Sequence, residues 1–239
     1  MSVLTLRLAG PLQSWGGSAR FTRRTTESAP TKSGVIGMLA AASGIERGDD
    51  AALVSLAALR FGVRIDQPGT RVRDFQTAHH SVTKTSMPLS ERFYLADAVF
   101  VAALEGDHTF LASLHAALRA PVYPPFLGRR SCPPARPVEL GLYDETSLGQ
   151  VLADEEWQAS PWYRRQRRGE ATVSLVVLRE ADENEHDTDF QRDQPLSFAA
   201  EHRRHALRTV VSRTVDIPNP DAVPSRRRHD PFEALEESA

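Results

Sequence analysis

Residues 21–41 read FTRRTTESAPTKSGVIGMLAA, so a basic loop rich in hydroxyl groups runs directly into an apolar, glycine-spaced helix. The first N–H groups of a helix have no partner inside the helix and lie at the positive end of its dipole, which together favour an anion. Arg23 and Arg24 lie in the approaching loop, and Lys32 lies at the expected helix start. The segment therefore predicts a helix over residues 31–43 with a phosphate site at its N-terminus.

The same residues also fit a purely structural role. Thr31 or Ser33 would cap a buried helix after Pro30, and Gly34 and Gly37 would permit close packing. A nucleotide-triphosphate loop is not expected, because the lysine and serine precede the glycine and a second glycine is missing at the required spacing. A phosphate site and a capped buried helix both stay open at this point.

The flanking segments alternate between strand and helix patterns. The sequence LTLRL over residues 4–8 alternates like a strand, and AGPLQSWGG breaks it with glycine and proline. In that loop, Gln13 and Trp15 either meet a base or, as we favour for the tryptophan, pack inward. Strands are expected over 2–8, 61–65 and 97–104, helices over 31–43, 50–59 and 108–119, and a short extended segment over 122–127. This β-α-β-β-α-β order is typical of an α+β, ferredoxin-like or RNA-recognition-motif-like domain, here over residues 1–143.

Residues 67–95 form a long polar excursion between two of these strands. It carries basic residues, aromatic residues and few acids, and a loop of this length in a compact domain is usually functional. Cations that meet phosphates and rings that stack on bases suit a nucleic-acid strand. We predict a projecting β-hairpin here, with a solvated loop as the alternative; its candidate RNA-binding residues are Arg71, Arg73, Lys84 and Arg92.

The segment YPPFLGRRSCPP over residues 123–134 predicts a second phosphate site. Its prolines make it rigid, Gly128 permits close backbone approach, and Arg129, Arg130 and Ser131 follow at once. Cys132 is the only cysteine, which excludes an intrachain disulfide and a cysteine-based zinc cluster. We expect an inert thiol, no metal site and no cofactor.

Composition predicts a soluble cytoplasmic protein that makes no use of a membrane. The chain has 239 residues, 41% of them hydrophobic, with no signal-like or membrane-length apolar run. Although the net charge is only −2, the arginines are clustered, and such clusters favour the binding of a polyanion at those places. Only Lys32 and Lys84 are lysines, so the basic groups are almost all guanidinium groups.

The last third predicts a smaller β-rich element over residues 144–224 and a flexible tail over 225–239. Strands are expected over 172–178 and 206–215, with an acidic loop over 180–189 between them. The Arg164-Arg165 and Arg167-Arg168 pairs have no assigned role.

Four sequence blocks together resemble the CasD family of the type I-E CRISPR surveillance complex, Cascade: LRLAGPLQSWG at 6–16, PTKSGVIG at 30–37, RDFQT at 73–77 and YPPFLGRRSCP at 123–133. The resemblance implies a RAMP fold, a modified RNA-recognition motif, in which the long hairpin is a thumb. It further implies binding of the 5′ handle of the CRISPR RNA (crRNA) in antiviral defence. The implied neighbours are CasC backbone subunits and the large CasA subunit, and target DNA is reached only through the complex.

The resemblance together with the basic residues of the long excursion gives the expected RNA-binding set: Gln13, Trp15, Arg23, Arg24, Thr31, Lys32, Ser33, Gly34, Arg71, Arg73, Lys84, Arg92, Gly128, Arg129, Arg130 and Ser131.

Two alternatives remain. A metal-independent endoribonuclease that processes precursor crRNA could use His79, His80, Lys84 and Tyr94 as acid, base or cation. None of these histidines lies in a shared block, and the resembled family does not process RNA itself, so we expect no enzyme. A free-standing RNA-recognition domain would carry a Lys/Arg-Gly-Phe pattern, whereas the strand over 97–104 offers only Phe100.

Overall fold

The computed structural model describes residues 1–16 and 23–223, so the expected tail over 225–239 lies outside the described residues. The fold is mixed α/β and contains a seven-stranded sheet and a four-stranded sheet. The large sheet has the order β10-β11-β9-β4-β7-β1-β8, with antiparallel neighbours throughout. Four of its strands come from the first 143 residues: β1 (Ser2–Ala9), β4 (Arg60–Gln67), β7 (Val99–Gly106) and β8 (Glu139–Tyr143).

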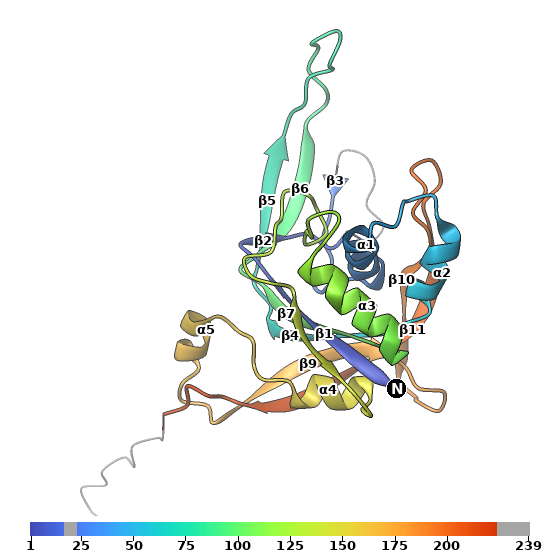
Figure 1. Cartoon of the computed structure of the whole chain (residues 1–239). Coiled ribbons are helices and arrows are strands. Elements are labelled where there is room, and N and C mark those ends of the chain that lie inside the picture. The colour runs from blue at the N-terminus through green and yellow to red at the C-terminus, as the bar shows by residue number, and fades with distance from the viewer. Residues whose placement is uncertain (17–22, 224–239) are drawn as a thin grey trace, which may run out of the picture.

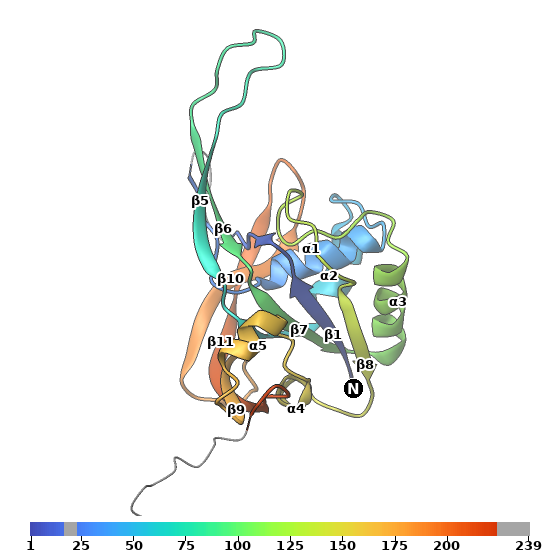
Figure 2. The same cartoon turned by 90° about the vertical axis from the view of Figure 1, so that its left-hand side faces the viewer.

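Side-chain alternation on β1 and β7 gives the large sheet two buried faces. Leu4, Leu6 and Phe100 face one core, whereas Val3 and Val101 face the other. The first face is covered by α1 (Lys32–Ala42), α2 (Asp50–Ala57) and α3 (His108–Arg119), and the second by α4 (Leu148–Asp154) (Figure 2). The expected helices are therefore present, and each packs an apolar side against the sheet.

The long excursion is a β-hairpin that stands away from the body (Figure 1). Its strands β5 (Thr70–Gln76) and β6 (Ser90–Ala96) pair antiparallel over their whole length. Two short strands complete the small sheet: β2 (Leu12–Gln13) pairs antiparallel with β6, and β3 (Arg23–Arg24) pairs parallel with it. The hairpin therefore shares its base with the loop that precedes α1.

The extended segment expected over residues 122–127, which stood as the last strand of the β-α-β-β-α-β order, is not a strand. The structure has no strand there, and β8 (Glu139–Tyr143) takes the place beside β1. Prolines at 121, 124 and 125 have no N–H to donate to a ladder, so this segment cannot pair regularly. Instead the Leu127 carbonyl accepts from the Ser14 main chain at 3.1 Å, which fixes the segment as a loop.

The C-terminal strands extend the large sheet across the expected boundary after residue 143. They are β9 (Thr172–Glu180), β10 (Thr188–Ser197) and β11 (Arg204–Pro218), and β9 pairs with β4. β10 was not expected, and the acidic loop is confined to the residues between β9 and β10. The short helix α5 (Pro161–Gln166) precedes β9. Among the described residues no helix has both the length and the hydropathy needed to cross a bilayer.

Candidate nucleic-acid interface

The anion position at the start of α1 is filled by a carboxylate of the protein itself. Thr31 caps the helix, and the main-chain N–H of Lys32 donates to Oδ2 of Asp193 at 2.7 Å. The Lys32 ammonium is buried and donates to Oε1 of Glu180 at 2.8 Å. Burial lowers the pKa of Lys32, and Glu180 partly opposes that shift. The N-terminus of α1 therefore acts as an internal junction with β9 and β10.

This arrangement favours the structural interpretation of the 31–34 turn. Thr31 and Lys32 are buried, and Ser33 is half-buried. A Cβ on Gly34 would lie 2.9 Å from the Trp15 ring, so this glycine serves close packing. Because Asp193 supplies the negative charge, a phosphate at this helix start would meet an occupied site.

Gln13 and Trp15 are also inside the protein. Both side chains are fully buried. Nε2 of Gln13 donates to the carbonyls of Leu8 and Ala98, and Oε1 of Gln13 accepts from the Trp15 indole at 3.0 Å. A ring that stacks on a base must be exposed, so we leave both residues out of the interface described below.

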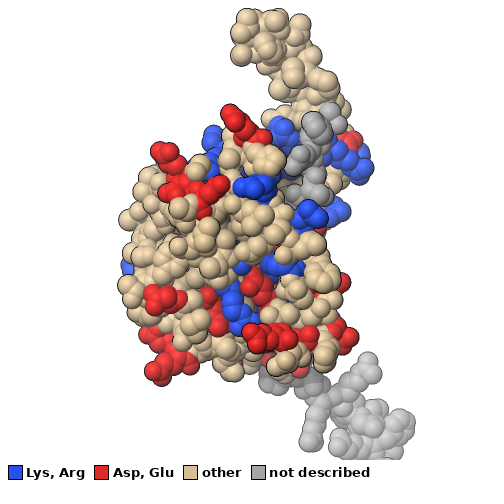
Figure 3. Space-filling model, turned by 90° about the vertical axis from the view of Figure 1, so that its right-hand side faces the viewer, with Lys and Arg blue, Asp and Glu red and all other residues tan. Residues whose placement is uncertain are grey.

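Arginines from three separate segments meet at the base of the hairpin. We call this region the hairpin-base surface; it consists of Arg23, Arg24, Arg71, Arg73, Arg92, Arg129 and Arg130. Parallel pairing of β3 with β6 sets Arg24 opposite Arg92, and Nη2 of Arg129 donates to the Arg24 carbonyl at 3.0 Å. Figure 3 shows Lys and Arg side chains gathered below the projecting hairpin, whose tip carries little charge in this view.

Aromatic rings of β6 support these guanidinium groups. Arg129 lies over the Tyr94 ring at 4.7 Å, and Arg23 lies over the Phe93 ring at 5.4 Å. On β5, Arg73 lies over Phe75 at 4.6 Å. Such stacking fixes the plane of a guanidinium while leaving its N–H groups available to an acceptor.

Two acidic residues of the hairpin lie beside these arginines. Glu91 contacts Arg23 and Arg73 at 3.8 Å, and Asp74 lies directly opposite Arg92 in the β5–β6 pairing. By contrast, Nε of Arg92 and Nη1 of Arg129 are buried and have no hydrogen-bond partner within residues 1–16 and 23–223. Buried donors without an acceptor are rare and costly. Among the described residues nothing accepts from these two N–H groups, and a phosphate oxygen is an acceptor of the kind they require.

The 128–131 turn is shaped by packing rather than by direct backbone approach to a ligand. Gly128 has a φ of +82°, and a Cβ there would lie 1.9 Å from the Ser14 carbonyl oxygen. The glycine thus docks the turn on the loop after β2, and this places Arg129 on Tyr94. Arg130 and Ser131 are exposed. Burial raises the pKa of the Cys132 thiol, as expected for an inert cysteine.

The residues considered for catalysis do not form one site. Tyr94 is buried at the hairpin base opposite Val72, whereas His79, His80 and Lys84 lie in the loop at the tip. His79 is seven positions after Val72, which on an extended chain is roughly 23 Å. Nδ1 of His80 accepts main-chain hydrogen bonds from Val82 and Thr83. Within the described ranges, no three His, Cys, Asp or Glu side chains group as metal ligands.

Comparisons with known proteins agree on one family. The family model described as CRISPR-associated protein (Cas_Cas5) matches residues 3–211. The CRISPR system Cascade subunit CasD of Escherichia coli (strain K12) is 36% identical in an alignment over 173 residues, and the match covers 65% of this chain and 77% of that relative.

Solved structures of Cas proteins resemble this fold over most of the chain. One described as a crystal structure of a Cas protein is 36% identical, with a TM-score of 0.69, and the match covers 92% of this chain and 97% of the other. A chain of a CRISPR RNA-guided surveillance complex is 30% identical, with a TM-score of 0.73, and the match covers 94% of this chain and 95% of that chain. Both matches extend over the two sheets.

Proposed function

This chain belongs to the CRISPR-associated Cas5 family, and we propose that it is the CasD-type subunit of a type I-E surveillance complex, where it binds and caps the 5′ handle of the crRNA. The observation that carries the proposal is the hairpin-base surface. Arginines of β3, β6 and the 128–131 turn meet there, and two of their buried N–H groups have no acceptor among the described residues.

The RAMP interpretation is supported by the order of the sheet. The elements β1, α1, β4, β7, α3 and β8 follow the β-α-β-β-α-β pattern, and their strands lie in the order β4-β7-β1-β8. This is a ferredoxin-like arrangement. In this interpretation the β5–β6 hairpin is the thumb, and β9, β10 and β11 are a family-specific extension of the sheet.

Handle binding would use phosphates more than bases. A guanidinium that stacks on a ring presents a planar fork of donors, which suits two oxygens of one phosphate. Arg129 on Tyr94 and Arg23 on Phe93 have this arrangement. The RNA strand would lie across the base of the thumb, and Arg71 and Arg73 on β5 would hold it from the other side.

The proposed role is binding without catalysis. Tyr94 is buried beneath Arg129, whereas His79, His80 and Lys84 lie in the exposed loop at the hairpin tip, away from the hairpin-base surface proposed to hold the RNA. Processing of the precursor RNA is assigned to another subunit of the complex. The proposed neighbours are the CasC backbone and the large CasA subunit, with target DNA reached through the complex in the cytoplasm.

The test is an RNA titration over a range of salt concentrations, with the purified chain and handle-bearing RNA. If about five phosphates are neutralised, the log-log slope should be about −3 to −4 for a single strand. Arg92→Gln should weaken binding about tenfold or more, because one charge-assisted contact is lost. Arg119→Gln, an exposed change at the end of α3, is the matched control. A slope near zero, or equal losses for both variants, would contradict the proposal.

A further inference from the structure

A second group of arginines lines a cleft outside the hairpin-base surface. The cleft has a volume of about 350 Å³ and lies where β1 ends, between residues 9–11, 97–99, 135–136 and 156–164. This volume is within the range of small-ligand pockets, about 300–1,000 Å³. Its walls carry three guanidinium groups, from Arg7, Arg136 and Arg164, two carboxylates, from Asp97 and Glu156, and the polar side chains of Gln158 and Ser160.

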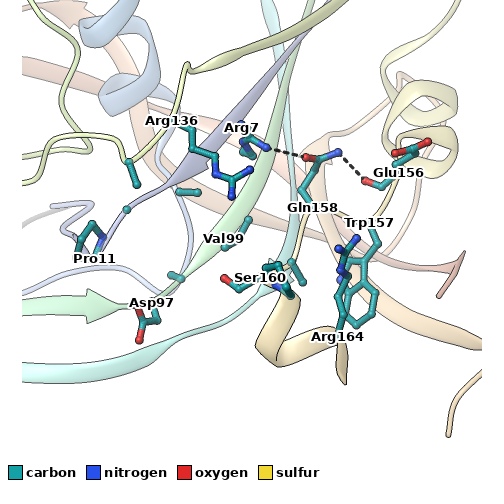
Figure 4. A pocket seen from close by; sticks show the side chains of 16 residues that line it. Arg7, Pro11, Asp97, Val99, Arg136, Glu156, Trp157, Gln158, Ser160 and Arg164 are labelled. Atoms are coloured by element: carbon teal, nitrogen blue, oxygen red, sulfur yellow. Dashed lines mark hydrogen bonds between the residues drawn. The ribbon is translucent and has the colours of Figure 1, made fainter. Parts of the chain in front are cut away.

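Two of these guanidinium groups have no acidic partner. Arg164 pairs with Asp221 at 3.2 Å, whereas neither Arg7 nor Arg136 forms an ion pair with any acid that the structure describes. Figure 4 shows Arg7 and Arg136 side by side, with the carboxylate of Glu156 turned away from both. Neither lining carboxylate pairs with Arg7 or Arg136, so these two guanidinium groups are left without a counter-charge among the described residues.

The N–H donors of Arg7 have few hydrogen-bond acceptors. Its Nη1 donates only a long bond of 3.4 Å to Oε1 of Gln158, and its Nε is buried without a partner in the described part of the chain. Burial and the neighbouring Arg136 both lower the pKa of Arg7. Arg7 is half-buried and Arg136 is exposed, and like charges held side by side cost free energy that an anion bound between them relieves. Arg7 and Arg136 thus favour an anion with several acceptor oxygens.

The cleft lies along the same loop as the hairpin-base surface. Arg130 and Arg136 are six residues apart, at most about 22 Å of extended chain. The loop is fastened to the cleft wall, because the Ala135 N–H donates to the Ala9 carbonyl at 2.9 Å and Gly10 packs against the Pro133 carbonyl. A strand that leaves Arg129 and Arg130 along this loop would arrive at Arg136.

We propose that the Arg7–Arg136 cleft is a separate phosphate site, which takes one phosphodiester group of the RNA strand beyond the hairpin-base surface. This assignment rests on the proposed RNA-binding function and adds a defined second contact to it. Arg7 and Arg136 bind the phosphate oxygens, and Gln158 and Ser160 supply hydrogen-bonding groups for the attached sugar or base. The site fixes the direction in which the strand leaves the thumb.

The test combines a protein variant with a neutral linkage in the RNA. Handle-bearing RNAs that each carry one methylphosphonate are titrated against the parent chain and against Arg136→Gln. In the parent, neutralising the linkage that lies in the cleft should weaken binding about tenfold. In Arg136→Gln, binding should already be weaker, the salt slope smaller by about 0.7, and the same methylphosphonate nearly without further effect. Arg119→Gln should behave as the parent.

Two results would overturn the assignment. One is equal sensitivity of parent and Arg136→Gln to every methylphosphonate. The other is unchanged RNA affinity together with lower retention of neighbouring subunits, which would assign the cleft to a protein carboxylate. In either case a loss at Arg92→Gln would leave the proposed function standing, whereas failure of the parent chain to bind the RNA would overturn that function itself.

Discussion

Oδ2 of Asp193 lies 2.7 Å from the main-chain nitrogen of Lys32 in the first turn of α1. The same carboxylate accepts from the Arg208 guanidinium, at 2.6 Å to Oδ1 and 3.0 Å to Oδ2. Arg208 and Asp193 are both nearly buried. The Asp193 carboxylate therefore accepts hydrogen bonds from the first turn of α1 and from a buried arginine at the same time. These bonds hold the edge strand β10 against α1.

Asp193→Ala should destabilise the fold strongly. The change leaves the Arg208 charge buried and unpaired, which typically costs about 3–5 kcal/mol. Urea denaturation of the full chain measures the loss. Asp189→Ala, an exposed change on the same strand, is the control and should change the unfolding free energy by less than about 0.5 kcal/mol. A loss below about 1 kcal/mol for Asp193→Ala would show that the junction is not structural.

Substitutions at Arg129 and Arg130 should both weaken RNA binding, but only the change at Arg129 should lower the stability of the fold. Arg130 is exposed, so Arg130→Gln should weaken the RNA complex and leave the melting temperature unchanged. Arg129→Gln should weaken RNA binding and also cost about 0.5–1 kcal/mol of stability through the lost contact with Tyr94. RNA titration and thermal melts on both variants check this. Normal RNA affinity in both would exclude the turn from the interface.

Gly128→Ala should damage the fold locally. Its φ of +82° strains any other residue, and the new Cβ would overlap the Ser14 carbonyl. We expect a loss of about 2 kcal/mol or more together with weaker RNA binding, because the turn that carries Arg129 must move. Gly169→Ala has open space around its Cβ and serves as the control. Equal melting temperatures for the two variants would contradict this.

The tip of the β5–β6 hairpin should be open to protease in the isolated chain and protected in the assembled complex. Its residues from Thr77 to Leu89 are exposed, with a single isolated bridge between His79 and Ser86. Trypsin should cleave after Lys84, and timed digestion of free chain and complex measures the difference. A variant in which a short Gly-Ser turn replaces residues 77–89 should fold normally but retain less RNA. Equal cleavage in both states would argue against the thumb.

Asp144 should titrate below the usual range of an aspartate. Hydrogen bonds from Ser2 and then from His108 lower the pKa of this carboxyl. The contribution of Asp144 to stability is therefore fully present above its unfolded pKa and is lost as the pH falls through its folded pKa. Carboxyl NMR should give this low midpoint, and Ser2→Ala should raise it. No change in midpoint in Ser2→Ala would exclude the serine as the main cause.

Local patterns were enough to predict most elements of the first 143 residues. The alternation in LTLRL, the apolar stripe of α3 and the capping residues depend on neighbours in sequence, so their positions agree with the structure within a few residues. The segment over 122–127 is not a strand because its prolines cannot pair, which is a local property of the sequence. β10 was missed because seven of its ten residues are polar, and its place is set by its distant partners α1 and β11.

Local composition and spacing were enough to predict the family, the order of the elements, the long hairpin and the supply of arginines. Which of those cations are neutralised depends instead on contacts between residues far apart in the chain. Lys32 is neutralised by Glu180, and its main-chain N–H is satisfied by Asp193, 161 residues away in the chain. Arg92, Arg129 and Arg7 instead keep buried N–H groups without partners among the described residues. The physical reason is that charge acts through space, so a carboxylate brought in by a distant strand closes one anion site while another stays open.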